Sequence, residues 1–230
     1  MASGLEGLSA TAAVWDAEYA AGRYEGEPPV GLVDDIVAAA RVDGAGSGLY
    51  VGCGSGRNVL PMIAAGLDLT CIDISGAAID RLRRKLPGKA AQFHVATVAD
   101  LPAGQWPLVI GIQVFQHGDR ETAHDNLRAA RDKVAPGGLF ALRVNAVGTD
   151  VWPAHDVVRR HADGGCTVRY LAGPKSGELI HFYSRDEVLA RFAGWGEVLA
   201  LRIARMARKP PEPGEWWQWE GIWRAPASLG

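Results

Sequence analysis

The residues best suited to chemistry form a glycine-rich turn between a short apolar run and a segment of helical composition. Gly52, Gly54 and Gly56 stand at alternate positions after the run that begins at Leu49. Glycine lets the backbone adopt a positive φ or approach a ligand closely, and the free N–H groups at a helix start favour electron-rich oxygens. The spacing therefore predicts a strand, a tight turn and a helix that together hold a ligand.

Two features of the sequence distinguish between the ligands that this glycine-rich turn could bind. Dinucleotide-binding turns follow the pattern G-x-G-x-x-G, and here the third glycine would fall on Arg57. The missing glycine argues against a nicotinamide-dependent oxidoreductase. The chain instead has G-x-G-x-G, followed by Asp73 at the end of the next apolar run, residues 67 to 74. A carboxylate at that place can accept hydrogen bonds from both hydroxyls of a ribose.

The combination of G-x-G-x-G and then Asp73 resembles the class I S-adenosylmethionine-dependent methyltransferases of the small-molecule type. The resemblance covers roughly residues 43–145. It implies an α/β, Rossmann-like, doubly wound seven-stranded sheet whose last strand is antiparallel, with S-adenosylmethionine as the cofactor and S-adenosylhomocysteine as the product. The positions that it assigns to cofactor binding are Gly52, Cys53, Gly54, Asp73, Ile74, Thr97, Val98, Gly111, Ile112 and Gln113.

Three positions depart from the pattern of that family. Tyr50 and Thr97 stand where acidic residues are common, and Pro107 stands where the central strand often begins with aspartate. Tyr50 removes the usual carboxylate contact to the ammonium group of the cofactor, so another residue or water must supply it. The hydroxyl of Thr97 can still form a hydrogen bond with the adenine edge.

Composition limits the partners and the setting. The 230 residues carry a formal net charge of -2 with both signs interspersed, so no basic surface for nucleic acid is expected. The three cysteines cannot all pair, and none stands in a C-x-x-C arrangement, so we expect no metal site and a reducing, cytoplasmic setting. No signal peptide or membrane span is predicted. The abundance of Ala, Gly and Arg is typical of a high-GC bacterial source.

Strand and helix patterns alternate strictly from residue 43 to residue 145, which predicts parallel strands with ligands bound at their carboxyl ends. After them we expect an irregular segment over 146–177, a strand at 179–183, and a terminal hairpin of strands 197–203 and 217–224. The predicted organisation is one domain, 1–230. Its parts are N-terminal lid helices (1–42), a cofactor-binding core (43–145), an acceptor-side insertion (146–183) and a C-terminal helix and hairpin (184–230).

The N-terminal segment carries an aromatic helical face. The first ten residues are expected to fray, and a helix is predicted over 11–24 with Trp15, Tyr19 and Arg23 at i, i+4 and i+8. The helix either caps the core or forms a lid over the cofactor. In the second interpretation Tyr19 contacts the cofactor and Trp15 contacts the acceptor.

One histidine is a candidate catalytic base. His117 follows the central strand, at the edge where ligands are expected, and an imidazole can take a proton from a hydroxyl or thiol acceptor. The alternative is that His117 donates to a backbone carbonyl and orients the turn. The residues that could line the acceptor pocket lie in or after the irregular segment, at His155, His161, His181 and Tyr183.

The sequence leads to one preferred function and leaves two others open. The preferred function is transfer of a methyl group to an O, S or N nucleophile of a small molecule. A non-catalytic protein that binds the cofactor or a partner is one alternative, because Tyr50, Thr97 and Pro107 are altered. A nucleic-acid methyltransferase is the other. The loop 113–116, Gln-Val-Phe-Gln, lacks the Asn/Asp-Pro-Pro-aromatic pattern of amino-methylating enzymes of that type.

Overall fold

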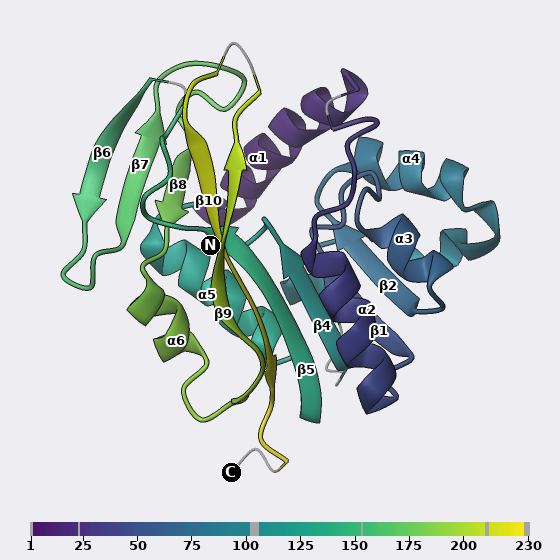
Figure 1. The fold of residues 1–230 in the computed structure, drawn as a ribbon. Coiled ribbons are helices and arrows are strands. Elements are labelled where there is room, and N and C mark those ends of the chain that lie inside the picture. The colour runs from purple at the N-terminus through teal and green to yellow at the C-terminus, as the bar shows by residue number, and fades with distance from the viewer. Residues whose placement is uncertain (1, 23, 102–105, 153, 210–211, 228–230) are drawn as a thin grey trace. The chain divides into compact units, whose positions relative to one another are not determined.

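The computed structural model divides into two compact units, Met1–Gly104 and Gln105–Gly230, which we call unit 1 and unit 2 (Figure 1). None of the helices in the described part of the chain is long and apolar enough to cross a bilayer. The structure describes residues 2–22, 24–101, 106–152, 154–209 and 212–227.

Unit 1 is built on three parallel strands. The central strand, β2 (Asp68–Asp73), pairs with β1 (Ser47–Val51) on one side and with β3 (Phe93–Val95) on the other. Leu49, Leu69 and Phe93 are fully buried, as expected for strands that are covered on both faces. The helical elements of unit 1 are α1 (Ala2–Ala20), α2 (Leu32–Asp43), α3 (Val59–Ala64), α4 (Gly76–Lys85), η1 (Pro87–Gln92) and η2 (Val98–Asp100).

The caps of the unit 1 helices explain where two of them begin and end. The Ser75 hydroxyl accepts a hydrogen bond from the backbone N–H of Ala78, so Ser75 is the N-cap of α4. α2 ends at Gly44, whose left-handed φ of 66° allows its N–H to bond to carbonyls of the last turn. α1 packs against α4. α1 begins at Ala2, earlier than the predicted start at residue 11, and fraying of the first ten residues stays a prediction.

Unit 2 holds the strands β4 (Trp106–Ile112), β5 (Val134–Asn145), β10 (Glu215–Arg224) and β9 (Gly196–Ala207) in this spatial order. β4 and β5 are parallel, while β10 runs antiparallel to both β5 and β9. The predicted terminal hairpin is therefore confirmed. Two helices belong to this unit, α5 (Arg120–Arg131) and α6 (Arg185–Arg191).

The strands of both units make up the expected sheet. Their order is β3-β2-β1-β4-β5-β10-β9, and the last strand in the chain, β10, is the antiparallel one. The predicted seven-stranded α/β fold is confirmed, with the N-terminal helix present. The function of that helix as a lid stays a prediction.

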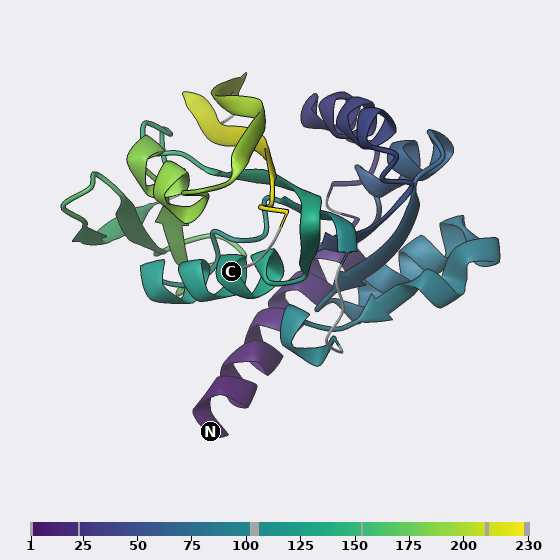
Figure 2. The same ribbon diagram turned by 90° about the horizontal axis from the view of Figure 1, so that it is seen from below.

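The segment expected to be irregular contains most of a second sheet. β6 (His155–Arg160), β7 (Cys166–Tyr170) and β8 (Leu179–Phe182) form an antiparallel sheet in unit 2, so the prediction of irregular structure over 146–177 was wrong. Figure 2 shows these strands at one side of unit 2, away from β9. A small apolar core of Cys166, Val168, Tyr170, Ile180 and Phe182 holds the sheet together.

Candidate functional site

The glycine-rich turn has the backbone geometry that its sequence predicts. Gly52, Gly54 and Gly56 all have a positive φ, of 68°, 54° and 94°. The N–H of Gly52 donates to the carbonyl of Ile72 at 2.8 Å, which ties the turn to the end of β2. A side chain at Gly54 would clash with the hydroxyl of Tyr19. Glycine is therefore required there both by the backbone conformation and by the space above it.

Asp73 lies beside this turn with its carboxylate held in place by backbone donors. One oxygen, Oδ2, accepts the N–H of Gly54 at 2.8 Å, and Oδ1 accepts the N–H of Ser75 at 2.9 Å. The residue is only 8% exposed. Burial raises the pKa of Asp73, while the bonds from Ser75 and Gly54 act against that shift. Each oxygen keeps further acceptor capacity, which two ribose hydroxyls could use.

Tyr50, one of the departures from the family pattern, belongs to the interior of unit 1. It is 1% exposed, and its hydroxyl accepts a hydrogen bond from Nδ2 of Asn58 at 3.3 Å. The other end of Asn58, Oδ1, accepts the backbone N–H of Val30 at 3.1 Å. Burial raises the pKa of Tyr50, so the phenol is neutral at physiological pH. Tyr50 therefore helps to hold Asn58, which connects the start of α3 to the segment before α2.

The predicted adenine contacts lie at the end of β3 and in η2. Thr97 forms a capping box with Asp100: its hydroxyl donates to Asp100 Oδ2 at 2.8 Å, and its N–H donates to the same oxygen at 2.7 Å. The hydroxyl of Thr97 is thus engaged with the carboxylate of Asp100. Val98 is buried, whereas Ile74 is partly exposed beside Asp73.

The aromatic face of α1 forms a cluster in unit 1. The rings of Trp15 and Tyr19 stack with centroids 5.9 Å apart, and Tyr24 lies 6.1 Å from Tyr19. Arg23, which was predicted on the same face, lies outside the described residues. Contact of Tyr19 with the cofactor and of Trp15 with an acceptor stays a prediction.

The central-strand positions belong to unit 2. Gly111 and Ile112 end β4, and Gln113 follows with a φ of 58°, an uncommon conformation for a residue with a side chain. Strained backbone of this kind is concentrated at functional sites. A side chain at Gly111 would overlap the ring of Phe115, so this glycine is also needed for packing. Participation of Gly111, Ile112 and Gln113 in cofactor binding stays a prediction.

His117 stands in the loop that follows β4. Its Nδ1 lies 3.9 Å from Oε2 of Glu178, and the backbone of His117 forms an antiparallel bridge with Ile180. Burial and the charge of Lys175 lower the pKa of His117 to about 3, against the opposing effect of a hydrogen bond to the backbone of Gln113. The imidazole is therefore neutral at physiological pH. It can accept a proton, but its low pKa makes it a weak base.

A comparison with known protein families gives one match. Residues 49–138, from within β1 to within β5, match the model of a methyltransferase domain. This segment is therefore similar in sequence to methyltransferase domains.

Solved structures that resemble the whole chain agree with this fold. Magnesium protoporphyrin IX methyltransferase from Synechocystis PCC 6803 with bound S-adenosylmethionine has a TM-score of 0.63 at 15% identity, covering 95% of this chain and 97% of that one. An N1-methyltransferase of 1,6-didemethyltoxoflavin from Burkholderia thailandensis has a TM-score of 0.60 at 13% identity, covering 95% and 90%. A structure described for the conversion of a disulfide into a thioacetal during echinomycin biosynthesis has a TM-score of 0.61 at 20% identity, covering 95% and 93%. No curated protein matches in sequence.

Two residues that were predicted to line the acceptor pocket are buried, outside the matched methyltransferase domain. His181 and Tyr183 are both 0% exposed. The hydroxyl of Tyr183 donates to the carbonyl of Phe115 at 2.6 Å, which fixes the end of β8 to the loop before His117. Their geometry therefore supports a positioning function for that loop and gives no support for contact with an acceptor. His155 is partly exposed, in β6 opposite Tyr170.

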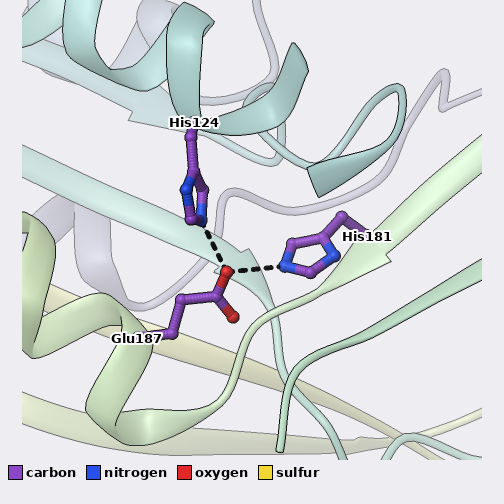
Figure 3. A group of neighbouring side chains, drawn as sticks. All are labelled: His124, His181 and Glu187. Carbon is purple, nitrogen blue, oxygen red and sulfur yellow. Dashed lines mark hydrogen bonds and ion pairs between the residues drawn. The ribbon is translucent and has the colours of Figure 1, made fainter. Parts of the chain in front are cut away.

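His181 is part of a buried cluster that sequence reasoning missed. Figure 3 shows the Nε2 atoms of His124 and His181 pointing at the same oxygen, Oε1 of Glu187, at 2.5 and 2.8 Å. Nε of Arg120 lies 3.1 Å from this oxygen, and the N–H of Ser184 donates to the other one. We call these residues, Arg120, His124, His181 and Glu187, the Glu187 cluster. Burial opposes ionisation of Glu187, but the bonds from His124 and His181 outweigh it and hold the pKa of Glu187 well below its usual range.

The Glu187 cluster has the ligand types of a metal site but the arrangement of an ion-pair network. The ligand atoms of His124, His181 and Glu187 lie within 4.8 Å of one another. However, three nitrogens, including that of the Arg120 guanidinium, already converge on Oε1. The Thr167 hydroxyl lies 3.0 Å from Nδ1 of His181. If this hydroxyl donates to Nδ1, the ring proton of neutral His181 is on Nε2 and points at the carboxylate of Glu187. Hydrogen bonds thus account for each of these contacts.

Proposed function

We propose that this chain transfers the methyl group of S-adenosylmethionine to an O, S or N nucleophile of a small molecule. The observation that carries the proposal is the carboxylate of Asp73, buried and held against the N–H of Gly54 within the glycine-rich turn. The turn leaves no room for a side chain at Gly54, and Asp73 offers acceptors at the end of a parallel strand. The methionine part of the cofactor would lie along the turn and its ribose at Asp73.

The chemistry asks little of the protein beyond positioning. S-adenosylmethionine supplies a methyl group that is activated by its sulfonium. The chain must hold the acceptor in line with that methyl group and exclude water. Where the acceptor is a hydroxyl or a thiol, His117 is our candidate to receive the proton, because its ring is neutral at physiological pH. The weakness of this base favours an acceptor that is already acidic, such as a phenol or a thiol, or one that needs no base, such as an amine.

The proposed class of acceptor is supported by the types of residue in α1 and by similarity to solved structures. The aromatic residues of α1 fit a planar or hydrophobic compound. Similar structures include a porphyrin and a toxoflavin-type methyltransferase, and also a sugar N-methyltransferase from Streptoalloteichus with a TM-score of 0.54. We place the reaction in the cytoplasm of a bacterium. The three buried, unpaired cysteines fit a reducing compartment, and the composition fits a high-GC source.

The decisive experiment is a calorimetric titration with S-adenosylmethionine, compared between the wild type and Asp73→Ala. We expect the variant to bind at least about tenfold more weakly, because the ribose loses hydrogen bonds to a charged acceptor. Asp68→Ala is the matched control, since Asp68 begins the same strand but is exposed, and its carboxylate accepts hydrogen bonds from Lys89 and Gln92 at the surface. The proposal fails if the wild type shows no heat at millimolar cofactor, or if Asp73→Ala binds as tightly as the wild type.

A non-catalytic cofactor-binding protein is the second candidate. It is favoured by Tyr50, which is buried against Asn58, and by Thr97, whose hydroxyl is engaged with Asp100. The two candidates differ in turnover. Production of S-adenosylhomocysteine with a panel of phenols, thiols and amines would reject the non-catalytic candidate.

A further inference from the structure

Asp16, which lies in α1, contacts the start of α4. Its Oδ1 accepts a hydrogen bond from the hydroxyl of Ser75 at 2.6 Å and another from the N–H of Ala77 at 3.0 Å. The N-terminus of a helix carries partial positive charge and free N–H groups, so a carboxylate there is stabilised. Asp16 thus gives α4 a cap that comes from a distant part of the chain.

Ser75 connects this contact to the carboxylate proposed to hold the ribose. While its hydroxyl donates to Asp16, its backbone N–H donates to Oδ1 of Asp73 at 2.9 Å. The same hydroxyl accepts the N–H of Ala78 at 3.1 Å. Asp16 and Asp73 are therefore joined through one residue, Ser75, whose hydrogen bonds fix its position.

Tyr19 places the same helix over the glycine-rich turn. It follows Asp16 by three residues, so both side chains lie on one face of α1. The hydroxyl of Tyr19 lies against Gly54, where a side chain would clash with it. After α1 the chain turns through Gly22, Tyr24 and Gly26, with φ values of 82°, 64° and 72°. α1 is therefore held through Asp16 and Tyr19 on one face and is followed by a turn.

We propose that Asp16 is a positioning residue that latches α1 onto α4 and thereby closes α1 over the cofactor site. The inference rests on the proposed binding of cofactor at the turn and Asp73. When Asp16 holds Ser75, the N–H of Ser75 and the hydroxyl of Tyr19 are both fixed around the ribose and the methionine part. Docking of α1 then raises the affinity for the cofactor. By thermodynamic linkage, the bound cofactor raises the docking equilibrium constant of α1 by the same factor.

The test compares Asp16→Ala and Asp16→Asn with the wild type by titration with S-adenosylhomocysteine and by limited trypsin digestion, in which we follow release of the fragment that ends at Arg23. Asp16→Ala removes the oxygen that accepts both hydrogen bonds and should weaken binding about tenfold, with Asp16→Asn in between because it keeps an oxygen without the charge. S-adenosylhomocysteine should slow cleavage in the wild type, and this protection should be lost in Asp16→Ala. Asp34→Asn is the control, because Asp34 is exposed in the first turn of α2.

The outcomes separate this inference from the proposed function. If Asp73→Ala weakens binding while Asp16→Ala binds and is protected like the wild type, the latch is refuted and the cofactor site stands. If neither variant changes binding, the cofactor site itself is refuted. A purely structural cap would lower the thermal midpoint of Asp16→Ala but leave both affinity and protection unchanged, which also overturns the latch. Rescue of affinity and protection by Asp16→Glu would support it.

Discussion

Replacement of Glu187 by glutamine tests the interpretation of the Glu187 cluster as an ion-pair network. The side chain is 1% exposed, and its Oε1 receives Arg120, His124 and His181. Glutamine has nearly the same shape and keeps one oxygen, but it removes the charge and adds an NH₂ group among donors. Breaking a buried ion pair costs about 3–5 kcal/mol, and a hydrogen bond to a charged group contributes about 1.5–3 kcal/mol. Because glutamine keeps one acceptor, we expect a loss of about 2–4 kcal/mol in unfolding free energy.

The measurement is denaturant and thermal unfolding followed by tryptophan fluorescence at neutral pH. A loss of about 2–4 kcal/mol corresponds to a fall of about 5–15 °C in the midpoint for a chain of this size. Glu121→Gln is the control, because Glu121 is exposed in the first turn of α5, one residue after Arg120. A loss below about 1 kcal/mol for Glu187→Gln, or an equal loss for the control, would refute the network as a source of stability.

The pH dependence of this difference has a defined sign. The folded-state pKa of Glu187 is lowered from an ordinary value of 4.5 by the bonds from His124 and His181, which overcome burial. A lowered carboxyl pKa contributes stability that is fully present above 4.5 and is lost as the pH falls through the folded-state value. The gap between wild type and Glu187→Gln should therefore be largest at neutral pH and narrow only below pH 4.5.

Two further predictions concern Asp73 and metal ions. Burial raises the pKa of Asp73 above 3.8, so the affinity for S-adenosylmethionine should fall on acidification, with the midpoint of this fall at a pH above 3.8. Calorimetry between pH 7 and 4 would show the fall. A midpoint at or below pH 3.8 would contradict the assigned environment. Since three nitrogens already converge on Glu187 Oε1, neither a chelator nor added Zn²⁺ should shift the thermal midpoint, and a rise of several degrees with stoichiometric Zn²⁺ would show that the cluster is a metal site.

The sequence predicted those parts of the fold that depend on local patterns. The strict alternation of strand and helix patterns over 43–145 predicted parallel strands, and β1, β2 and β3 do pair in parallel, as do β4 and β5. The second sheet was missed because β6 has no apolar alternation. The strand from His155 to Arg160 has two adjacent valines flanked by polar residues and is largely exposed, so its signal is pairing with β7. Such pairing depends on tertiary context that a single strand does not carry.

The candidate site also has one part that local sequence patterns predict and one part that depends on tertiary contacts. The turn and Asp73 lie within 22 residues of one another, so glycine spacing and strand length were enough to predict that they meet. The Glu187 cluster joins residues up to 67 positions apart, and only the Ser184–Glu187 capping box gave a local signal for one member. Tyr50 could be recognised as a departure from the family, but its partner Asn58 could not, because that contact depends on how the helix after the turn packs.

The glycine-rich turn and the loop around His117 are held by separate sets of contacts. The glycine-rich turn, Asp73 and Ser75 are held by contacts within unit 1, and Asp16 and Tyr19 complete them from α1. The loop around His117 is held instead by β8, through the bridge to Ile180 and the bond from Tyr183 to Phe115, and β8 is anchored in turn by the Glu187 cluster. Substitutions in the second sheet can therefore move the loop around His117 without touching any hydrogen bond of the turn. If the proposed function holds, acceptor preference should vary with residues 146–183 while the affinity for the cofactor stays constant.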